Sequence, residues 1–252
     1  MQLTGNAILV TGGCSGIGRG LAESLHKLGN KVIIAGRRQG ALEETTRANP
    51  GIVSMNLNVN DPETIRAFAD RVTAEHPGLN VLINNAGIMK TENLKTLPAC
   101  LGESEAVITT NLLGPIRLTA ALLPYLRRQT HATIVNVSSG LAFVPLPVTP
   151  TYSATKAALH SYTLSLRVQL ADTAVEVIEI IPPAVATDLT PGRSTSDPRM
   201  MSLPDFIDQT MQILQKQPTP SEICVESVKF LRFAEATGTF DKALQQLSAV
   251  RL

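Results

Sequence analysis

The chain has 252 residues, of which 44% are hydrophobic, and its 22 basic residues nearly balance its 21 acidic ones. A chain of this length can bury a full core, and the balanced charge and the lack of a long apolar run argue against nucleic-acid and membrane partners. We therefore expect one soluble α/β domain, residues 1–252, that acts on a small molecule.

The cysteines and histidines indicate neither a disulfide nor a metal. The three cysteines are far apart in the sequence, and the four histidines show no ligand spacing. No basic stretch followed by an apolar one opens the chain, so we expect no secretory signal. A cytoplasmic enzyme without a metal fits these features best.

The chain begins with the pattern strand, glycine-rich turn, helix. Ala7–Val10 is a short apolar strand that runs into Thr11–Gly18, after which a helical pattern starts. Glycines let the backbone approach a pyrophosphate, and the helix N-terminus presents free N–H groups to phosphates. Three glycines in this context favour dinucleotide binding over a plain tight turn, although the spacing of Gly12, Gly16 and Gly18 is not the most common one.

The second strand, Lys31–Ala35, is followed by Gly36, Arg37 and Arg38. An acidic residue at this strand end would bind the ribose hydroxyls of NAD, whereas two guanidinium groups suit the 2′-phosphate of NADP. We therefore predict NADP(H) as the preferred cofactor, with NAD(H) as the alternative. The other interpretation is that the two arginines are exposed to solvent on a loop and bind no ligand.

The middle of the chain continues the alternation of helices and strands. A third strand at Ile52–Asn56 and a fourth at Val81–Ile83 flank a helix, and Asn84–Gly87 follows the fourth strand at the ligand-binding edge of the sheet. A long helical pattern from about residue 104 to 128 then carries Asn111 and Pro115, which are both unfavourable inside a helix. Such a break in local rules marks a functional site or a tolerated kink.

A fifth strand, Thr133–Val137, leads through two serines and an apolar loop to Tyr152 and Lys156, which are four residues apart at the start of a helix. At this spacing both side chains share one helical face. An ammonium beside a phenol favours the phenolate, so Tyr152 is a candidate general acid/base. Taken alone the pair is a weak signal, because short motifs match freely.

The last third of the chain contains a sixth strand, Val175–Ile181, and then Pro182–Thr187 at the same edge. The composition of the next segment predicts a mobile substrate flap over the site, at about residues 188–216. Helical patterns, one of them at residues 221–235, predict an atypical helical tail at about 217–252 without a seventh strand. The predicted fold is a Rossmann-like doubly wound parallel β-sheet of six strands with helices on both faces.

These motifs occur in an order and spacing that resembles the short, single-domain branch of the short-chain dehydrogenase/reductase superfamily, over about residues 5 to 190. The resemblance implies that the Ser139 hydroxyl binds a substrate carbonyl and that Tyr152 donates the proton. It also implies that Lys156 lowers the tyrosine pKa and holds the nicotinamide ribose. Asn111 would fix a water that relays protons from Lys156. The motifs that carry the resemblance are Thr11–Gly18, Asn84–Gly87, Asn111, Ser139, Tyr152 and Lys156.

The resemblance also implies a set of cofactor-binding residues. Two departures from the family pattern lie nearby, since Asn58 stands where an adenine-binding Asp is usual and Pro183 where a Gly is usual. Without a seventh strand, a homodimer through the helices that hold Asn111 and Tyr152 is expected, with the family's tetramer as the alternative. The implied cofactor-binding residues are Gly12, Cys14, Ser15, Gly16, Ile17, Gly18, Arg37, Arg38, Asn58, Val59, Asn85, Ala86, Gly87, Tyr152, Lys156, Pro182, Val185 and Thr187.

The leading functional hypothesis is an NADPH-dependent oxidoreductase that reversibly reduces a small, largely apolar ketone or aldehyde, as a carbonyl reductase or alcohol dehydrogenase does. The apolar expectation comes from residues 141–148, Met89 and Leu189, almost none of which is charged. The few cations available nearby are Lys90 before the long helix and Arg193 in the flap. The alternative is a catalytically idle NADP-binding sensor or scaffold. A nucleotide-sugar isomerase or dehydratase would need a larger substrate domain than this chain provides.

Overall fold

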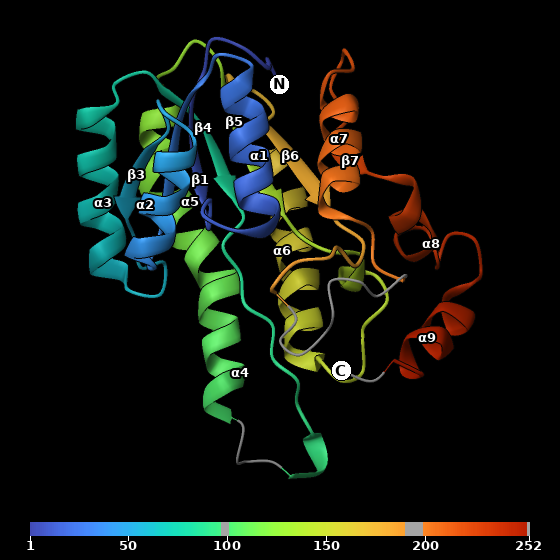
Figure 1. The fold of residues 1–252 in the computed structure, drawn as a ribbon. Helices are drawn as coiled ribbons and strands as arrows, with labels where there is room; N and C mark the ends of the chain where they lie inside the picture. The colour runs from blue at the N-terminus through green and yellow to red at the C-terminus, as the bar shows by residue number, and fades with distance from the viewer. Residues whose placement is uncertain (97–100, 190–198, 251–252) are drawn as a thin grey trace.

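The computed structural model describes residues 1–96, 101–189 and 199–250, and in these segments seven strands form one parallel sheet (Figure 1). The strand order is β3-β2-β1-β4-β5-β6-β7. The central strands are apolar runs buried on both faces, as is usual where helices cover both sides of a parallel sheet. The strands are β1 (Ala7–Thr11), β2 (Lys31–Gly36), β3 (Val53–Asn56), β4 (Leu79–Asn84), β5 (Ala132–Val137), β6 (Val175–Ile181) and β7 (Glu222–Cys224).

Helices cover both faces of this sheet (Figure 1). One hydrophobic core lies between the sheet and α1, α2 and α7, and a second lies between the sheet and α3, α5 and α6. The α-helices of the described segments are α1 (Gly16–Lys27), α2 (Gln39–Ala48), α3 (Pro62–Glu75), α4 (Leu101–Ile108), α5 (Gly114–Leu126), α6 (Pro150–Gln169), α7 (Leu203–Leu214), α8 (Lys229–Arg232) and α9 (Phe240–Ser248).

The strand order reverses between β1 and β4, which pair directly although β2 and β3 separate them in the sequence. Connections from the two halves of the sheet leave in opposite directions at this point, which opens a crevice at the carboxyl edge. The predicted Rossmann-like doubly wound sheet with helices on both faces is thereby confirmed.

The prediction that no seventh strand follows residue 220 is wrong. β7 pairs in parallel with β6, with Glu179 opposite Glu222 and Ile181 opposite Cys224. Three residues are too few to show a strand period, and a helical pattern covers the same stretch. The edge of β6 supplies the hydrogen bonds that make this segment a strand. Within the helical pattern predicted at residues 221–235, the helical segments are the short η4 (Glu226–Val228) and α8.

The long helix predicted from residue 104 to 128 contains a π-helical turn, Thr109–Leu113, between α4 and α5. Asn111 lies in this turn and is buried, while Pro115 lies in the first turn of α5. Proline is tolerated in a first turn, and π-turns occur often at functional sites. The two residues that break local helix rules therefore stand where the helix changes its hydrogen-bond pattern.

The stretch Leu101–Leu126 is long and apolar enough to cross a membrane by length and composition, with a mean hydropathy of 1.4. The core helix of a soluble protein passes the same test, and 44% of the most apolar window is buried within the fold. Leu118, Leu122 and Leu126 are fully buried in the second core.

The end of the predicted substrate flap is the core helix α7. Phe206 is fully buried in the first core, and a Cβ at Gly20 of α1 would lie 2.6 Å from Ile207 Cγ1, so the two helices are closely packed. Met201 N donates to Ala184 O and ties the start of this segment to the loop after β6. Residues 190–198 of the predicted flap, including Arg193, lie outside the described residues.

Candidate active site

The loops at the carboxyl edge of the sheet surround one cavity of about 1200 Å³. Three predicted site residues, Gly18, Asn58 and Asn111, do not line it. The predicted residues that line it are Gly12, Cys14, Ser15, Gly16, Ile17, Arg37, Arg38, Val59, Asn85, Ala86, Gly87, Ser139, Tyr152, Lys156, Pro182, Val185 and Thr187.

The glycine turn after β1 requires its glycines. Gly12 and Gly16 have φ angles of +64° and +50°, in the region that disfavours side chains. A Cβ at Gly18 would lie 2.4 Å from the carbonyl oxygen of Gly12 and 2.3 Å from Asn85 Nδ2. Gly18 therefore acts from behind the turn, where it lets α1 start close to β1. Gly16 and Ile17 at the N-terminus of α1 line the cavity, and a helix N-terminus at such a place fits a pyrophosphate.

Hydrogen bonds join this turn to the end of β4. Thr11 Oγ1 accepts from the backbone N–H groups of Asn85 at 3.0 Å and Ala86 at 3.1 Å. In return, Asn85 Nδ2 donates to the carbonyl oxygens of Thr11 at 3.0 Å and Gly12 at 3.3 Å. Asn85 thus joins the end of β4 to the glycine turn and also lines the cavity.

The two arginines after β2 line the cavity beside the glycine turn. Arg38 Nη2 donates to Ser15 Oγ at 2.7 Å, so a guanidinium stands directly beside the glycine turn. Arg37 is exposed and also lines the cavity. Asn58 behaves differently, because its Oδ1 accepts from Asn60 N at 3.2 Å within its own loop. Its predicted contact with adenine stays a prediction.

Tyr152 and Lys156 lie one turn apart on α6, and both are buried. Burial raises the pKa of Tyr152 to about 12, and a hydrogen bond with Ser139 opposes the rise. Burial lowers the pKa of Lys156 to about 8, and the Glu179 carboxylate opposes that fall. Burial therefore outweighs the predicted lowering of the tyrosine pKa, and the phenol keeps its proton at neutral pH.

Lys156 lies over the ring of Tyr152 and is held there by the main chain. Lys156 Nζ donates to Val137 O at 2.8 Å, at the carboxyl end of β5, and lies 5.6 Å from the centre of the Tyr152 ring. The bond to Val137 holds Lys156 at a place where the lysine lines the cavity.

The two serines after β5 differ in their partners. Ser138 Oγ lies 3.5 Å from Ile180 O, its hydrogen-bond acceptor on β6. Ser139 Oγ accepts from Leu141 N at 3.1 Å, so its own proton is free for another acceptor, and it reaches Tyr152. Ser139 therefore contacts the tyrosine, and its role as the carbonyl-binding residue stays a prediction.

Asn111 contacts the site only through other residues. Its Oδ1 accepts from Ile88 N at 2.9 Å and its Nδ2 donates to Ile88 O at 2.8 Å. A longer bond of 3.4 Å joins Nδ2 to Thr155 Oγ1 on α6. Asn111 therefore fixes the loop after β4 against the catalytic helix, and its predicted role in a proton relay stays a prediction.

One residue that sequence reasoning missed is Glu92. Its carboxylate accepts from Thr151 N at 3.1 Å and from the hydroxyls of Thr151 and Ser104, both at 2.7 Å. A negative charge at this place caps the N-terminus of α6, the helix that carries Tyr152. No local signal could have shown this, because the capping carboxylate lies 59 residues before Thr151 in the sequence.

The family model for short chain dehydrogenase matches residues 6–197. The chain belongs to the short-chain dehydrogenase family.

Individual relatives of this short-chain dehydrogenase agree with the family match. The uncharacterized oxidoreductase DltE of Bacillus subtilis is 40% identical over 251 residues, which cover 98% of each chain. A short-chain dehydrogenase of Burkholderia cenocepacia, solved with NADP, superposes with a TM-score of 0.81 at 25% identity and full coverage of both chains. A 3-ketoacyl-(acyl-carrier-protein) reductase of Brucella melitensis, solved with NADH, has a TM-score of 0.77 at 25% identity, covering 86% of this chain and 93% of its own.

We expect Lys156 to make the unfolding free energy depend on pH. Its folded-state pKa of about 8 lies below the ordinary 10.5, so the unfolded chain binds more protons between these values. Stability therefore rises with pH through this window. From pH 7.5 to 10, the wild type should gain on the order of 2 kcal/mol relative to Lys156→Met, because one pKa unit corresponds to about 1.4 kcal/mol.

Urea unfolding of both proteins at these two pH values measures the difference. The exposed Lys27→Met serves as the matched control for the loss of a lysine. A difference between wild type and Lys156→Met that stays constant with pH would contradict the lowered pKa.

Proposed function

We propose that this short-chain dehydrogenase is an NADPH-dependent reductase of a small, largely apolar ketone or aldehyde, with Tyr152 as the proton donor and the reverse oxidation also available. The observation that carries the proposal is the meeting of two sets of residues in one cavity. Ser139, Tyr152 and Lys156 line the same space as the glycine turn and the pair Arg37 and Arg38.

Ser139, Tyr152 and Lys156 would each have a separate role in the reduction. When bound, NADPH supplies the hydride. Ser139 would donate its hydroxyl proton as a hydrogen bond to the substrate carbonyl oxygen, and Tyr152 would transfer its proton to the alkoxide as it forms. The raised pKa of Tyr152 keeps that proton in place until the alkoxide needs it. Lys156 lies beside Tyr152 and would hold the ribose next to the nicotinamide.

Several facts support NADPH over NADH. Arg37 and Arg38 follow β2, and Arg38 already bonds Ser15 in the glycine turn, so a phosphate placed there would meet two guanidinium groups. The Burkholderia relative was solved with NADP. The Brucella reductase was solved with NADH, and NAD(H) is therefore kept as the alternative cofactor.

The far side of the cavity supports an apolar substrate. Lys90 lines it too, but its ammonium pairs with Glu103 at 3.0 Å. Phe143 and Val144, which belong to the predicted apolar loop, face elsewhere: Phe143 contacts His160, and Val144 packs against the tail. The charged residues Asp188, Arg199 and Glu226 also line the cavity. Apolar residues from three loops and from the C-terminal tail form most of this wall, namely Met89, Leu141, Leu146, Leu189, Met200, Met201, Phe230, Leu231, Leu247 and Val250.

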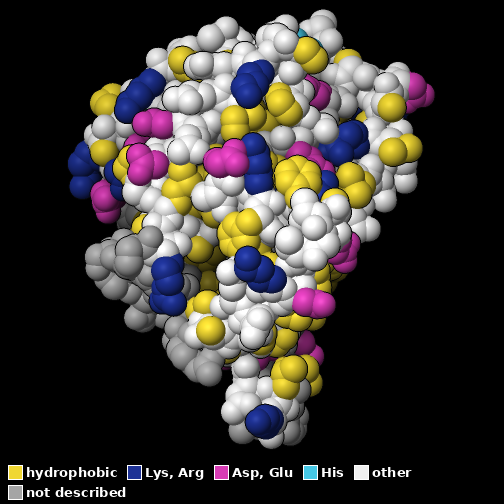
Figure 2. Space-filling model, turned by 90° about the vertical axis from the view of Figure 1, so that its right-hand side faces the viewer, with side chains coloured by type: hydrophobic (Ala, Val, Ile, Leu, Met, Phe, Trp, Pro, Cys, Tyr) yellow, Lys and Arg dark blue, Asp and Glu magenta, His cyan; other side chains and the backbone are white. Residues whose placement is uncertain are grey.

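The contribution of the tail was not predicted. Figure 2 shows the face that carries the C-terminal helices, where apolar side chains lie among basic and acidic ones. Phe230 on α8 is 53% exposed although it borders the cavity. An apolar molecule that covered this ring would remove further hydrophobic surface from water.

The cellular setting and the assembly are also proposals. We place the enzyme in the cytoplasm, on the cysteine usage. The presence of β7 removes the sequence argument for a dimer over a tetramer, because the last strand is the one that the family uses in a second dimer interface. A homodimer through α4, α5 and α6 therefore stands beside a tetramer as the proposed assembly.

Tyr152→Phe should lower kcat by two to four orders of magnitude, the usual loss when one general acid is removed. NADPH binding should change little, because the ring and its packing remain. Reduction of simple ketones followed by NADPH absorbance measures the loss. Tyr162→Phe makes the same change ten residues later on the same helix and should keep its activity. If Tyr152→Phe retained more than half of the activity, the idle sensor or another proton donor would replace this proposal.

Replacing Arg37 and Arg38 together by Ala should shrink the preference for NADPH over NADH more than tenfold. Each charge-assisted bond to a phosphate contributes roughly 1.5 to 3 kcal/mol, and NADH has no 2′-phosphate to lose. The ratio of kcat/KM for the two cofactors measures the effect. Arg47→Ala, an exposed change at the end of α2, is the control. An unchanged ratio in the double variant would refute the assignment.

Matched ketones that end in a methyl group or in a carboxylate test the substrate class. The methyl compound should have a kcat/KM at least tenfold higher, since desolvating an unpaired carboxylate costs several kcal/mol. The comparison is made with both compounds under NADPH saturation. Preference for the carboxylate would show that a cation at the cavity, such as Lys90, receives an acidic substrate instead.

A further inference from the structure

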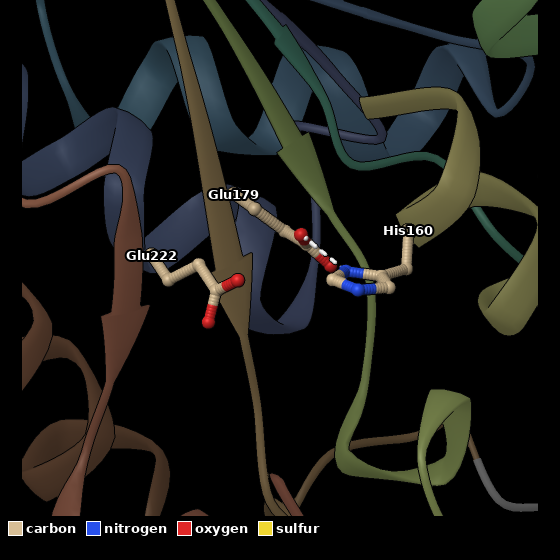
Figure 3. Close-up of side chains that lie close together, drawn as sticks. All are labelled: His160, Glu179 and Glu222. Atoms are coloured by element: carbon tan, nitrogen blue, oxygen red, sulfur yellow. Dashed lines mark hydrogen bonds and ion pairs between the residues drawn. The ribbon is translucent and has the colours of Figure 1, made fainter. Parts of the chain in front are cut away.

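A cluster of ionisable side chains lies beyond Lys156, outside the proposed mechanism. His160 comes from α6, Glu179 from β6 and Glu222 from β7, and Figure 3 shows the three side chains meeting. The nitrogen and oxygen atoms that could bind a metal ion all lie within 4.8 Å of one another. Glu179 and Glu222 are direct partners in the parallel pairing of their strands. Two carboxylates in this position repel each other unless positive charge lies between them.

Glu179 has an unused oxygen in this cluster. Its side chain is completely buried, and its Oε2 lies 2.7 Å from His160 Nδ1. Its Oε1 is buried as well and has no hydrogen-bond partner among the described residues. A buried carboxylate is costly unless it is paired or coordinates a metal. The imidazole satisfies only one of the two oxygens.

Glu222 is already oriented by a neighbour. Arg232 Nε donates to its Oε2 at 2.7 Å, and Arg232 Nη2 donates to its Oε1 at 2.9 Å. The guanidinium lies 4.5 Å from the centre of the Phe143 ring, which in turn contacts the His160 ring edge-to-face at 4.7 Å. A carboxylate has about four lone-pair sites, so two remain after a bidentate arginine. Arg232 and Phe143 thus fix the orientation of two donors, as the outer residues of metal sites do.

We propose that His160, Glu179 and Glu222 bind a divalent transition-metal ion, with Zn²⁺ as the ion best suited to them. One imidazole nitrogen and two carboxylate oxygens are ligands that zinc accepts, and three protein ligands leave the fourth position for water. The ion replaces the proton that bridges His160 and Glu179 and takes up the free Oε1.

Only small movements are needed for this site. With bonds of about 2.0 to 2.2 Å, the donors of a tetrahedral zinc ion lie roughly 3.4 Å apart. The 2.7 Å contact between His160 and Glu179 must open slightly, and separations that reach up to 4.8 Å must close. Rotation of the Glu222 side chain from the edge strand β7 can provide that closure.

A metal ion at this place would join the tail to the catalytic helix. His160 lies one helical turn beyond Lys156 on α6, and β7 leads directly to α8, which carries Phe230 and Leu231 of the cavity wall. The ion would cross-link α6, β6 and β7 and stabilise this wall. Its role is structural, and no step of the proposed reduction passes through it.

Zinc titration of the full-length, metal-free protein tests the proposal, with binding followed by calorimetry and by thermal unfolding. Zn²⁺ at a hundredfold excess over its Kd should raise the Tm by roughly 5 to 10 °C. His160→Gln and Glu179→Gln should reduce the affinity at least tenfold. His131→Gln is the matched control, because that imidazole bonds Asn80 away from the cluster. This control should retain the wild-type affinity.

Absence of zinc binding by the wild type would overturn the proposal. It would also fail if His160→Gln bound zinc as well as the wild type did, since the ion would then sit elsewhere. Should the variants fold poorly, Co²⁺ bound to the wild type decides the matter. Visible absorption typical of tetrahedral Co²⁺ with nitrogen and oxygen ligands, displaced by one equivalent of Zn²⁺, supports the site, and its absence refutes it.

Discussion

Parallel pairing of the strands is the constraint on which the rest of this structure depends. Because β1, β4, β5 and β6 run the same way, their carboxyl ends and the loops after them reach one edge of the sheet. The reversal of strand order between β1 and β4 opens that edge. Thr11 and Asn85 then lock the two strand ends together through four hydrogen bonds, so the phosphate turn and the loop after β4 have fixed relative positions.

Helix α6, which carries Tyr152 and Lys156, is held in place by buried polar contacts. Glu92 caps its first turn, and Thr163 near its end accepts from Asn136 at 2.9 Å, so both ends of the helix are fixed by buried polar contacts. Asn84 Nδ2 extends the same network by donating to Asn136 Oδ1 at 2.9 Å. Such a satisfied network positions Tyr152 firmly, because breaking any member would leave a buried polar group unpaired.

The residues that line the cavity extend beyond the part of the chain that the family model matches. The family model ends at residue 197, whereas the apolar wall includes Phe230, Leu231, Leu247 and Val250 from beyond it. The glycine turn, Ser139, Tyr152 and Lys156 therefore lie within the part that the family model matches, whereas part of the apolar wall lies beyond it. The packing of Gly140 against Leu231 and Val228, where a Cβ would lie 2.8 Å from each, joins these two parts of the chain.

The sequence alone determined the alternation of strands and helices, the phosphate turn and the spacing of Tyr152 and Lys156, because each of these is a local pattern. It did not determine β7, whose three residues become a strand only beside β6. The cap at Glu92 and the cluster of His160 with Glu179 and Glu222 also needed the tertiary structure, since their members are far apart in the chain. Burial decided the rest: the pKa of Tyr152 rises because the folded protein removes the phenol from water, which no spacing of residues could show.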